Sequence, residues 1–281
     1  MSALAAALAD GDNGLDFGRV SVWLNDPANW WGQNGLLVHL REHVYYTLIA
    51  VIVALLIALP LGLWIGHTGR GVLAVAGLAN GLRAVPSLGL VVLLVVWLSP
   101  KIHATSTTVP GLVPLGALPY FIPVEIVLVV LAIPPILTNT YAGVQNVDPA
   151  VRDAAKGMGM TGVQVVRKVE LPIALPLVVS GIRSATLQVI ATATVAAYAP
   201  LLGGLGRLII DGTDTLNDPH SGYPAMVSAG IVVAVLAVVA DLALIGIERL
   251  IVSRGVSERF SRRVAVPQPA TSTPPAQGTA F

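Results

Sequence analysis

The chain of 281 residues contains no cysteine and few charged side chains. Without cysteine, neither a disulfide nor a thiolate metal site can form. Lysine, arginine, aspartate and glutamate together make up 11% of the sequence, whereas they account for about a quarter of an ordinary soluble domain. Hydrophobic residues make up 55% of the chain. This composition predicts an integral membrane protein.

Sequence motifs of nucleotide hydrolysis and of metal-dependent catalysis are missing as well. The chain has no G-x-x-x-x-G-K-[ST] segment, with which many ATPases hold phosphate groups. His39 and His43 are four residues apart and can share a helix face, but no further metal-ligand candidate joins them. No segment resembles the turn that carries a catalytic serine in hydrolases. We therefore expect no catalytic residue, no metal site and no cofactor bound by this chain.

Five apolar segments are long enough to cross the roughly 30 Å hydrocarbon core of a bilayer. They cover residues 44–66, 72–98, 120–144, 173–198 and 224–247. The second segment is interrupted by Arg83, Pro86 and Ser87, which are tolerated at membrane depth where protein or water satisfies the polar groups. We therefore expect an all-α integral membrane protein with about five transmembrane helices.

Lysine and arginine near the span ends indicate orientation, because they concentrate on the cytoplasmic side of a membrane. One side of a five-span arrangement carries most of them: Arg70, Arg152, Lys156, Arg167, Lys168, Arg249, Arg254, Arg259, Arg262 and Arg263. The other side carries Arg19, Arg41, Lys101 and Arg207, next to an acidic N-terminal segment. The pattern predicts an N-terminus outside the cell and a C-terminus in the cytoplasm.

Three regions follow from this arrangement. Residues 1–43 are expected to form an extracytoplasmic segment, whose three tryptophans suit either a membrane interface or the core of a small extramembrane cap. Residues 44–250 form the transmembrane domain. Residues 251–281 form a cytoplasmic tail that is first basic and then rich in proline, and the composition of its end predicts disorder.

A polar segment at residues 148–172 separates the third span from the fourth. Asp148 is placed to cap a helix that has Pro149 in its first position, and Gly157 and Gly159 end this helix. Apolar side chains share one of its faces: Val151, Ala154, Ala155 and Met158. Polar side chains are expected to point away from that face: Arg152, Asp153 and Lys156.

A second short helix is predicted within the same segment. Thr161, followed three residues later by Gln164, forms a capping-box pattern, and Pro172 marks a boundary or a kink beyond it. Two short helices in succession predict an amphipathic hairpin between two spans, which we call the polar hairpin (residues 148–172).

The spacing within the polar hairpin resembles the EAA loop of ABC importer permeases. Seven positions carry the resemblance: Asp153, Ala154, Ala155, Gly159, Val169, Leu171 and Pro172. Asp153 stands where the family usually has glutamate, and Val169 stands where it usually has isoleucine. The resemblance implies that these residues couple the chain to a separate ATPase subunit. Ala154, Ala155 and Met158 would fill a groove of that ATPase, and Asp153 would either pair with a cation there or remain a solvated charge.

Four further stretches resemble permeases of osmoprotectant importers, the glycine betaine, carnitine and choline group of the binding-protein-dependent type I (MetI-like) family. They are RAVPSLGL at 83–90, IPPILTNTYAGV at 133–144, GIRSATLQVIATATV at 181–195 and GGLGRLIIDG at 203–212. The resemblance implies one half of a channel in the bacterial cell membrane that moves a compatible solute inward by alternating access. Its partners would be a second permease subunit, ATPase subunits that bind ATP and magnesium, and an extracytoplasmic substrate-binding protein.

Polar side chains at membrane depth usually face a bundle interior or a cavity. On this ground the candidates for the translocation pathway are Asn139, Gln188, Thr192, Thr194 and Tyr198. Such residues also form hydrogen bonds that hold helices together, which is an equally good interpretation of the threonines. For Arg83 and Arg183 we expect a structural role, because a buried cation would repel a quaternary ammonium group.

Two other functions are compatible with the residues. The chain could be an ABC permease for another small solute, such as an amino acid. It could also be an ion-driven secondary transporter, in which Glu125 and Asp241 would be the coupling carboxylates. A secondary transporter has no need of the polar hairpin, which favours the ABC permease.

Overall fold

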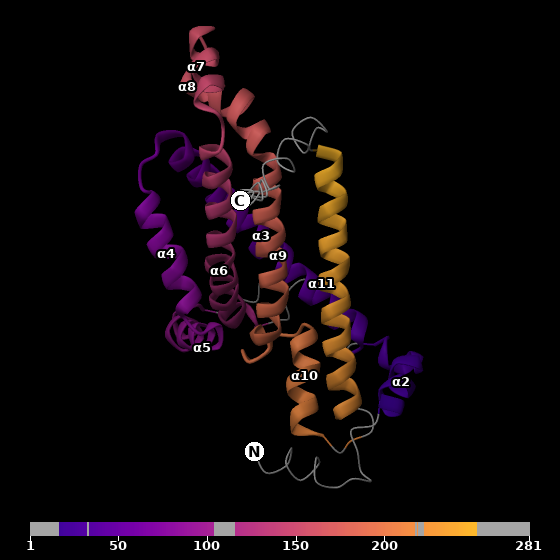
Figure 1. Cartoon of the computed structure of the whole chain (residues 1–281). Helices are drawn as coiled ribbons and strands as arrows, with labels where there is room; N and C mark the ends of the chain where they lie inside the picture. The colour runs from indigo at the N-terminus through magenta and orange to yellow at the C-terminus, as the bar shows by residue number, and fades with distance from the viewer. Residues whose placement is uncertain (1–16, 33, 104–115, 217, 219–221, 252–281) are drawn as a thin grey trace, which may run out of the picture.

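The computed structural model describes residues 17–251 apart from positions 33, 104–115, 217 and 219–221 (Figure 1). Every regular element within these residues is helical, which confirms the expected all-α fold. In chain order the elements are α2 (Phe17–Asn25), η1 (Pro27–Asn29), α3 (Leu36–Thr68), α4 (Val72–Ala84), α5 (Ser87–Leu98), η2 (Ser99–Lys101), α6 (Leu118–Gln145), α7 (Pro149–Gly157), α8 (Gly162–Val165), the π-helical turn η3 (Val166–Glu170), α9 (Leu171–Ala196), α10 (Leu205–Asp214) and α11 (Tyr223–Ile251). Most of the expected tail and the beginning of the N-terminal segment lie outside the described residues.

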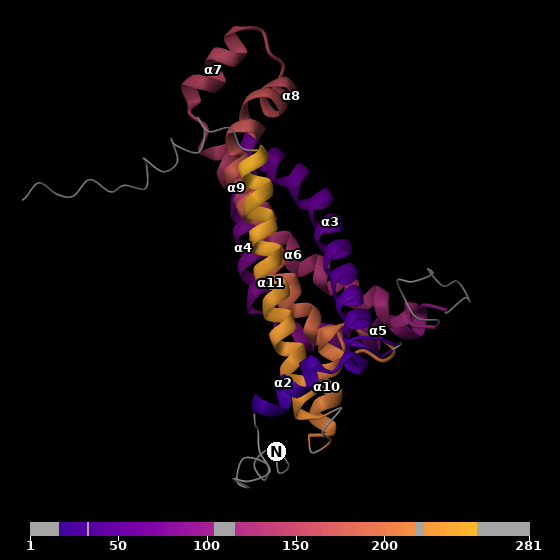
Figure 2. The same ribbon diagram turned by 90° about the vertical axis from the view of Figure 1, so that its right-hand side faces the viewer.

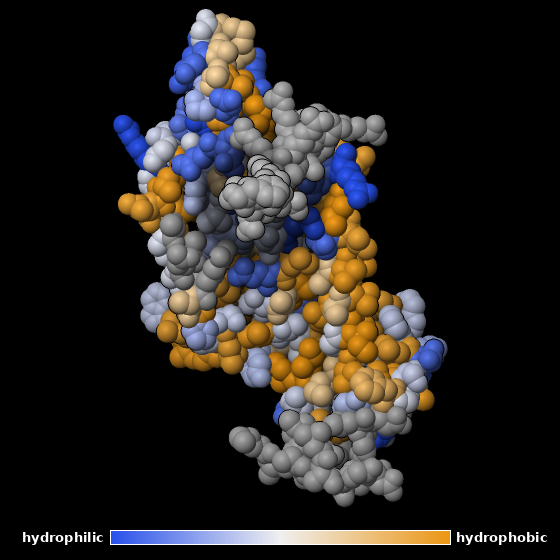
Figure 3. Space-filling view, viewed as in Figure 1, coloured by the Kyte–Doolittle hydropathy of each residue, from blue (hydrophilic) through white to orange (hydrophobic). Residues whose placement is uncertain are grey.

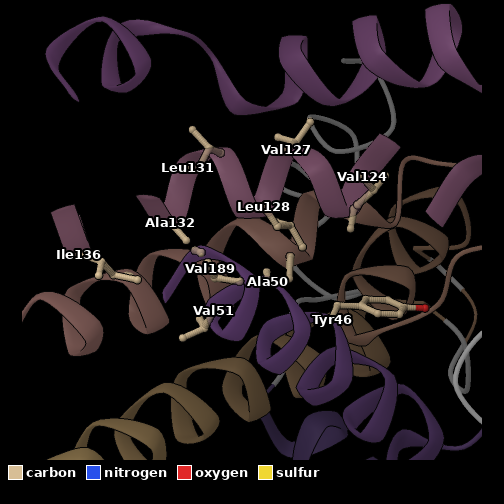
Figure 4. Close-up of a cluster of buried hydrophobic side chains, with 14 of the residues drawn as sticks. Tyr46, Ala50, Val51, Val124, Val127, Leu128, Leu131, Ala132, Ile136 and Val189 are labelled. Carbon is tan, nitrogen blue, oxygen red and sulfur yellow. The ribbon is translucent and has the colours of Figure 1, made fainter. Parts of the chain in front are cut away.

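Four helical segments are long and apolar enough to cross a membrane: α3, α6, α11 and the continuous stretch Gly162–Ala196, which contains α8, η3 and α9. Helix α6 packs against both α3 and α9, and α11 lies beside α9 (Figures 1 and 2). Buried side chains such as Tyr46, Leu128 and Val189 fill the space between α3, α6 and α9 (Figure 4).

Glycines allow these three helices to approach one another closely. A Cβ atom added at Gly62 of α3 would lie 2.7 Å from the Cβ of Thr140 in α6. A Cβ atom added at Gly181 of α9 would lie 2.8 Å from the Cβ of Asn139 in α6. Both separations are too short for a real contact, so α3, α6 and α9 form a tight core that would open if either glycine carried a side chain.

The second predicted span is a bent pair of helices. Helix α4 has 13 residues and α5 has 12, so each is about 20 Å long at 1.5 Å per residue and too short to cross a membrane. Val85 and Pro86 between them have extended backbone angles, because proline lacks an amide hydrogen and disfavours helical geometry at the preceding residue. Helix α5 is viewed nearly end-on in Figure 1, where α4 runs alongside the bundle. The expectation of five spans is thereby refined to four complete spans and one bent pair.

The two ends of the bundle differ in character. The polar hairpin projects from one end, whereas α2 and α10 lie at the other (Figure 1). The described basic residues of the hairpin end are Arg70, Arg152, Lys156, Arg167, Lys168 and Arg249. Apolar residues cover the middle of the face in Figure 3, and hydrophilic residues gather toward the hairpin end.

One ion pair joins α9 to α11 within the spans. The Nε atom of Arg183 donates to Oδ1 of Asp241 at 2.9 Å, and its Nη2 atom donates to Oδ2 at 3.1 Å. Glu248, two helical turns further along α11, lies 3.6 Å from Nη1 of the same guanidinium. Arg183 thus pairs with carboxylates of α11, in line with the structural role expected from the sequence, and Asp241 has a fixed partner.

Replacing Arg183 by leucine leaves Asp241 without its closest partner. We expect Arg183→Leu to lower the free energy of unfolding by roughly 1–3 kcal/mol, less than the loss of a fully buried pair because these side chains are partly exposed. The double variant Arg183→Leu/Asp241→Leu removes both charges and should regain most of that loss. Thermal unfolding in detergent measures both variants, and a double variant no more stable than the single one would contradict the assignment.

Candidate functional site

The first helix of the polar hairpin is formed by local signals. The Asp148 carboxylate accepts a hydrogen bond of 2.9 Å from the backbone N–H of Ala150, and Pro149 occupies the first turn of α7. Helix α7 ends at Gly157, and Gly159 has a φ of +81°, a left-handed conformation that favours glycine. The predicted cap, start and end of this helix are confirmed.

The second helix begins with the predicted capping box. The backbone N–H of Thr161 donates to Oε1 of Gln164 at 2.8 Å, and the N–H of Gln164 donates to Oγ1 of Thr161 at 3.4 Å. Helix α8 continues through η3 into α9, and Pro172 lies in the first turn of α9, at the predicted boundary. Helices α7 and α8 project beyond the ends of the spans (Figure 2).

The tip of the polar hairpin presents apolar side chains to the outside. Met158 is 73% exposed and Val163 is 67% exposed, although each is a large hydrophobic residue. Asp153 and Ala154 are exposed on α7. An exposed apolar patch with charged neighbours is typical of a protein interface.

Ala155 does not belong to this exposed surface. It is only 2% exposed, so the prediction that it fills a groove of an ATPase is wrong. Its small side chain packs on the inner side of α7, where a larger residue would push the hairpin open. The last three positions of the EAA resemblance lie at the root of the hairpin, where Val169 and Leu171 are half-buried and Pro172 is exposed.

A buried carboxylate lies at the same root. Glu170, the last residue of η3, is fully buried. Its Oε1 atom lies 2.7 Å from Nε of Arg152 in α7. Its two oxygens lie 3.0 and 2.9 Å from Nδ1 of His67, near the end of α3. The guanidinium of Arg152 also donates to the backbone carbonyl of Val144, in the last turn of α6. We call these four groups the Glu170 cluster.

No sequence motif singles out Glu170. The helical spacing predicts Arg152 on the side of α7 that faces away from the apolar residues, together with Asp153 and Lys156. Arg152 instead points inward to Glu170, whereas Asp153 and Lys156 are exposed as expected. The π-helical turn η3 inserts an extra residue into the helical register, so that Glu170 faces inward while Arg167 and Lys168 are exposed. The one sequence signal for Glu170 is its position as a lone acidic residue between basic residues and an apolar span.

Four of the five pathway candidates lie on α6 and α9, in different surroundings. Asn139 donates to the carbonyl of Pro135 in its own helix at 2.8 Å and lies against Gly181. Thr192 and Thr194 donate to carbonyls of α9, those of Gln188 and Ala191 respectively.

Tyr198 lies just beyond the end of α9 and is 59% exposed. Together with Tyr120 of α6 it lines a cavity of about 320 Å³, whose other walls are valines of α5 and small residues. A second cavity of about 590 Å³ lies at the same end of the bundle, between η1, α3 and α10, and Trp23, Trp31 and Arg207 are among its lining residues.

The glycine-rich stretch after α9 is shaped by close contacts. A Cβ atom at Gly206 would fall on the backbone carbonyl of Thr194, and one at Gly203 would fall on the Glu42 carboxylate. That carboxylate accepts a hydrogen bond of 2.9 Å from the N–H of Gly204, the residue that caps α10. These glycines hold the start of α10 against α3 and the end of α9.

Comparison with known proteins identifies relatives of the chain. Residues 58–252 match the family model described as "Binding-protein-dependent transport system inner membrane component". The glycine betaine/carnitine/choline transport system permease protein OpuCB of Bacillus subtilis (strain 168) is 30% identical over 235 residues, which are 83% of this chain and 97% of that protein. The choline transport system permease protein OpuBB of the same organism is 31% identical over 79% of this chain and 90% of its own length.

Two further comparisons agree with these. The carnitine transport permease protein OpuCD of Listeria monocytogenes is 32% identical over 80% of this chain and 92% of its own length. Among solved structures, an inward-facing conformation of the MetNI methionine ABC transporter superposes with a TM-score of 0.59. The superposed regions are 22% identical and cover 78% of this chain and 96% of that chain. At this identity the likeness shows a shared fold.

Proposed function

Since this chain belongs to the family of binding-protein-dependent transport system inner membrane components, we propose that it carries small quaternary ammonium osmoprotectants across the inner membrane. As a member of this family it is a multi-pass permease subunit of an ABC importer, and it works with an ATPase and a binding protein. Membership removes the ion-driven secondary transporter from the alternatives.

One observation supports the proposed substrate class. Relatives that are 30–32% identical over about four-fifths of this chain are permeases named for glycine betaine, carnitine or choline. Each of these solutes has a trimethylammonium group, which binds favourably to aromatic faces. Tyr120 and Tyr198 are among the residues that line one cavity, together with apolar side chains, which supports the proposal. Of the five pathway candidates, Tyr198 is the one that lines a described cavity, and the proposed pathway also includes Asn139, Gln188, Thr192 and Thr194.

The polar hairpin is the proposed contact with the ATPase. Met158 and Ala154 offer exposed apolar surface, and the exposed Asp153 is available to a cation of the partner. Gly159 makes the turn between the two short helices, and Ala155 supports them from inside. Val169, Leu171 and Pro172 join the hairpin to α9. ATP and magnesium bind to the partner ATPase in this proposal.

The proposed orientation places the polar hairpin in the cytoplasm. The concentration of described basic residues at the hairpin end supports it, because such residues favour the cytoplasmic side. Residues 1–43 are then extracytoplasmic, and residues 251–281 follow α11 into the cytoplasm. A second permease subunit, identical or paralogous, completes the channel.

In this assembly, closure of the ATPase dimer on ATP would move the docked hairpins and turn the spans from inward-facing to outward-facing. A ligand shifts such an equilibrium only by its difference in affinity for the two states. ATP binding therefore has to be tighter in one state of the permease pair. The binding protein has to deliver substrate to the pair in that same state.

Uptake by vesicles tests the proposed function. We expect the complex of this chain with its cognate ATPase and binding protein to accumulate radiolabelled glycine betaine or choline when ATP is supplied on the hairpin side. Methionine should neither be accumulated nor compete. Uptake that persists without ATP, or that is absent in the complete system, would refute the proposal, and accumulation of methionine instead would reassign the substrate.

A second prediction concerns the hairpin tip. Met158→Asp places a charge on an exposed surface, so insertion and thermal stability should stay at the wild-type level. Loss of an apolar anchor from an interface costs about 1–2 kcal/mol or more, so we expect at least an approximately fivefold weaker association with the ATPase. Co-purification at graded salt measures the association, and Met158→Leu is the volume-matched control. Wild-type association of Met158→Asp would mean that the tip is not the docking surface.

A further inference from the structure

The Glu170 cluster occupies the point where the polar hairpin meets the spans. Glu170 belongs to η3 and immediately precedes α9, His67 lies near the end of α3, and Val144 lies near the end of α6. Arg152, the fourth member, belongs to α7 of the hairpin itself. One buried carboxylate and one guanidinium thus connect α7 to the hairpin ends of three membrane helices.

Burial makes these contacts obligatory. A carboxylate that is fully removed from water is costly unless it is paired and hydrogen-bonded. Glu170 meets this condition through Arg152 and His67, and the Arg152 pairing would be lost if α7 moved away from η3 and α3. Among the described ion pairs, that of His67 with Glu170 is the one that joins the polar hairpin to α3, and that of Arg152 with Glu170 joins α7 to the same carboxylate.

One of the two chain connections between the hairpin and the spans is not helical. Helix α6 is joined to α7 by the three residues 146–148, which lie outside both helices. On the other side, α8 runs through η3 into α9 as one continuous helical stretch. Without the cluster, α7 would be held to the spans by residues 146–148 and by its packing on α8 and η3.

Because the cluster fixes α7 against the ends of the spans, we propose that Glu170 is the positioning residue that transmits movement of the hairpin to α3, α6 and α9. The inference rests on the proposed function, since it assumes that an ATPase moves the hairpin. Arg152 transmits a pull on α7 to Glu170 and to the end of α6. Glu170 passes it to α9 through the chain and to α3 through His67. ATP hydrolysis without this cluster would move α7 and leave α3 and α6 behind.

The ratio of solute transported to ATP hydrolysed tests this role in the reconstituted complex. Glu170→Gln keeps the size of the side chain and removes its charge. We expect the ATPase to remain bound and ATP hydrolysis to stay within about twofold of the wild type, while the transport ratio falls at least tenfold. Arg152→Gln should behave in the same way. The control is Arg70→Gln, which removes an exposed arginine at the same end of the bundle and should leave the ratio unchanged.

A purely structural role gives a different result. If Glu170 only stabilises the fold, Glu170→Gln lowers the amount of complex, uptake and hydrolysis fall together, and the ratio stays at the wild-type value. That outcome overturns the proposal. A wild-type complex that shows no ATP-driven uptake at all refutes the proposed function instead, before any variant is compared.

A distance measurement covers the case in which Glu170→Gln yields too little complex for transport assays. Because the chain has no cysteine, Lys156→Cys in α7 and Thr68→Cys at the end of α3 can carry spin labels without background. With Glu170 present, the distance between the labels should stay the same when ATP is added. In Glu170→Gln or His67→Gln the distance distribution should broaden or shift with ATP. An ATP-independent distance in these variants would overturn the proposal.

Discussion

The close approach of α3, α6 and α9 is the constraint on which the rest of the structure depends. Lipid tails are as apolar as leucine, so these helices associate through packing and hydrogen bonding and gain little from the hydrophobic effect. Glycines at the crossing points supply that packing, since Gly62 and Gly181 face side chains of α6 that leave no room for a Cβ atom. A firm core of three helices gives the projecting hairpin a base against which it can act.

The hairpin and the core are joined by chemistry of a different kind. Core contacts are apolar and spread over many residues, whereas the junction depends on one buried carboxylate with two cationic or hydrogen-bonding partners. Directional contacts of this type hold one geometry, while apolar surfaces can slide over one another. The position of Glu170 at a π-helical turn agrees with the frequent occurrence of such turns at functional sites.

Features with local causes could be predicted from the sequence. The caps at Asp148 and Thr161 and the turn at Gly159 each depend on residues a few positions apart, and the structure has all three. The burial of Glu170 could not be foreseen, because it depends on His67, 103 positions away in the chain, and on a shift of helical register. The burial of Ala155 does not follow from the apolar face of α7 alone, because one side of this helix also has to cover the hairpin's own interior.

The break at Pro86 limits where lipid can lie. Helix α5 begins without a side-chain cap, so the amide groups of its first turn have no partner within the helix. In hydrocarbon each such group would cost several kcal/mol. The start of α5 therefore has to adjoin water or protein, of this chain or of a neighbouring one, and not bare acyl chains.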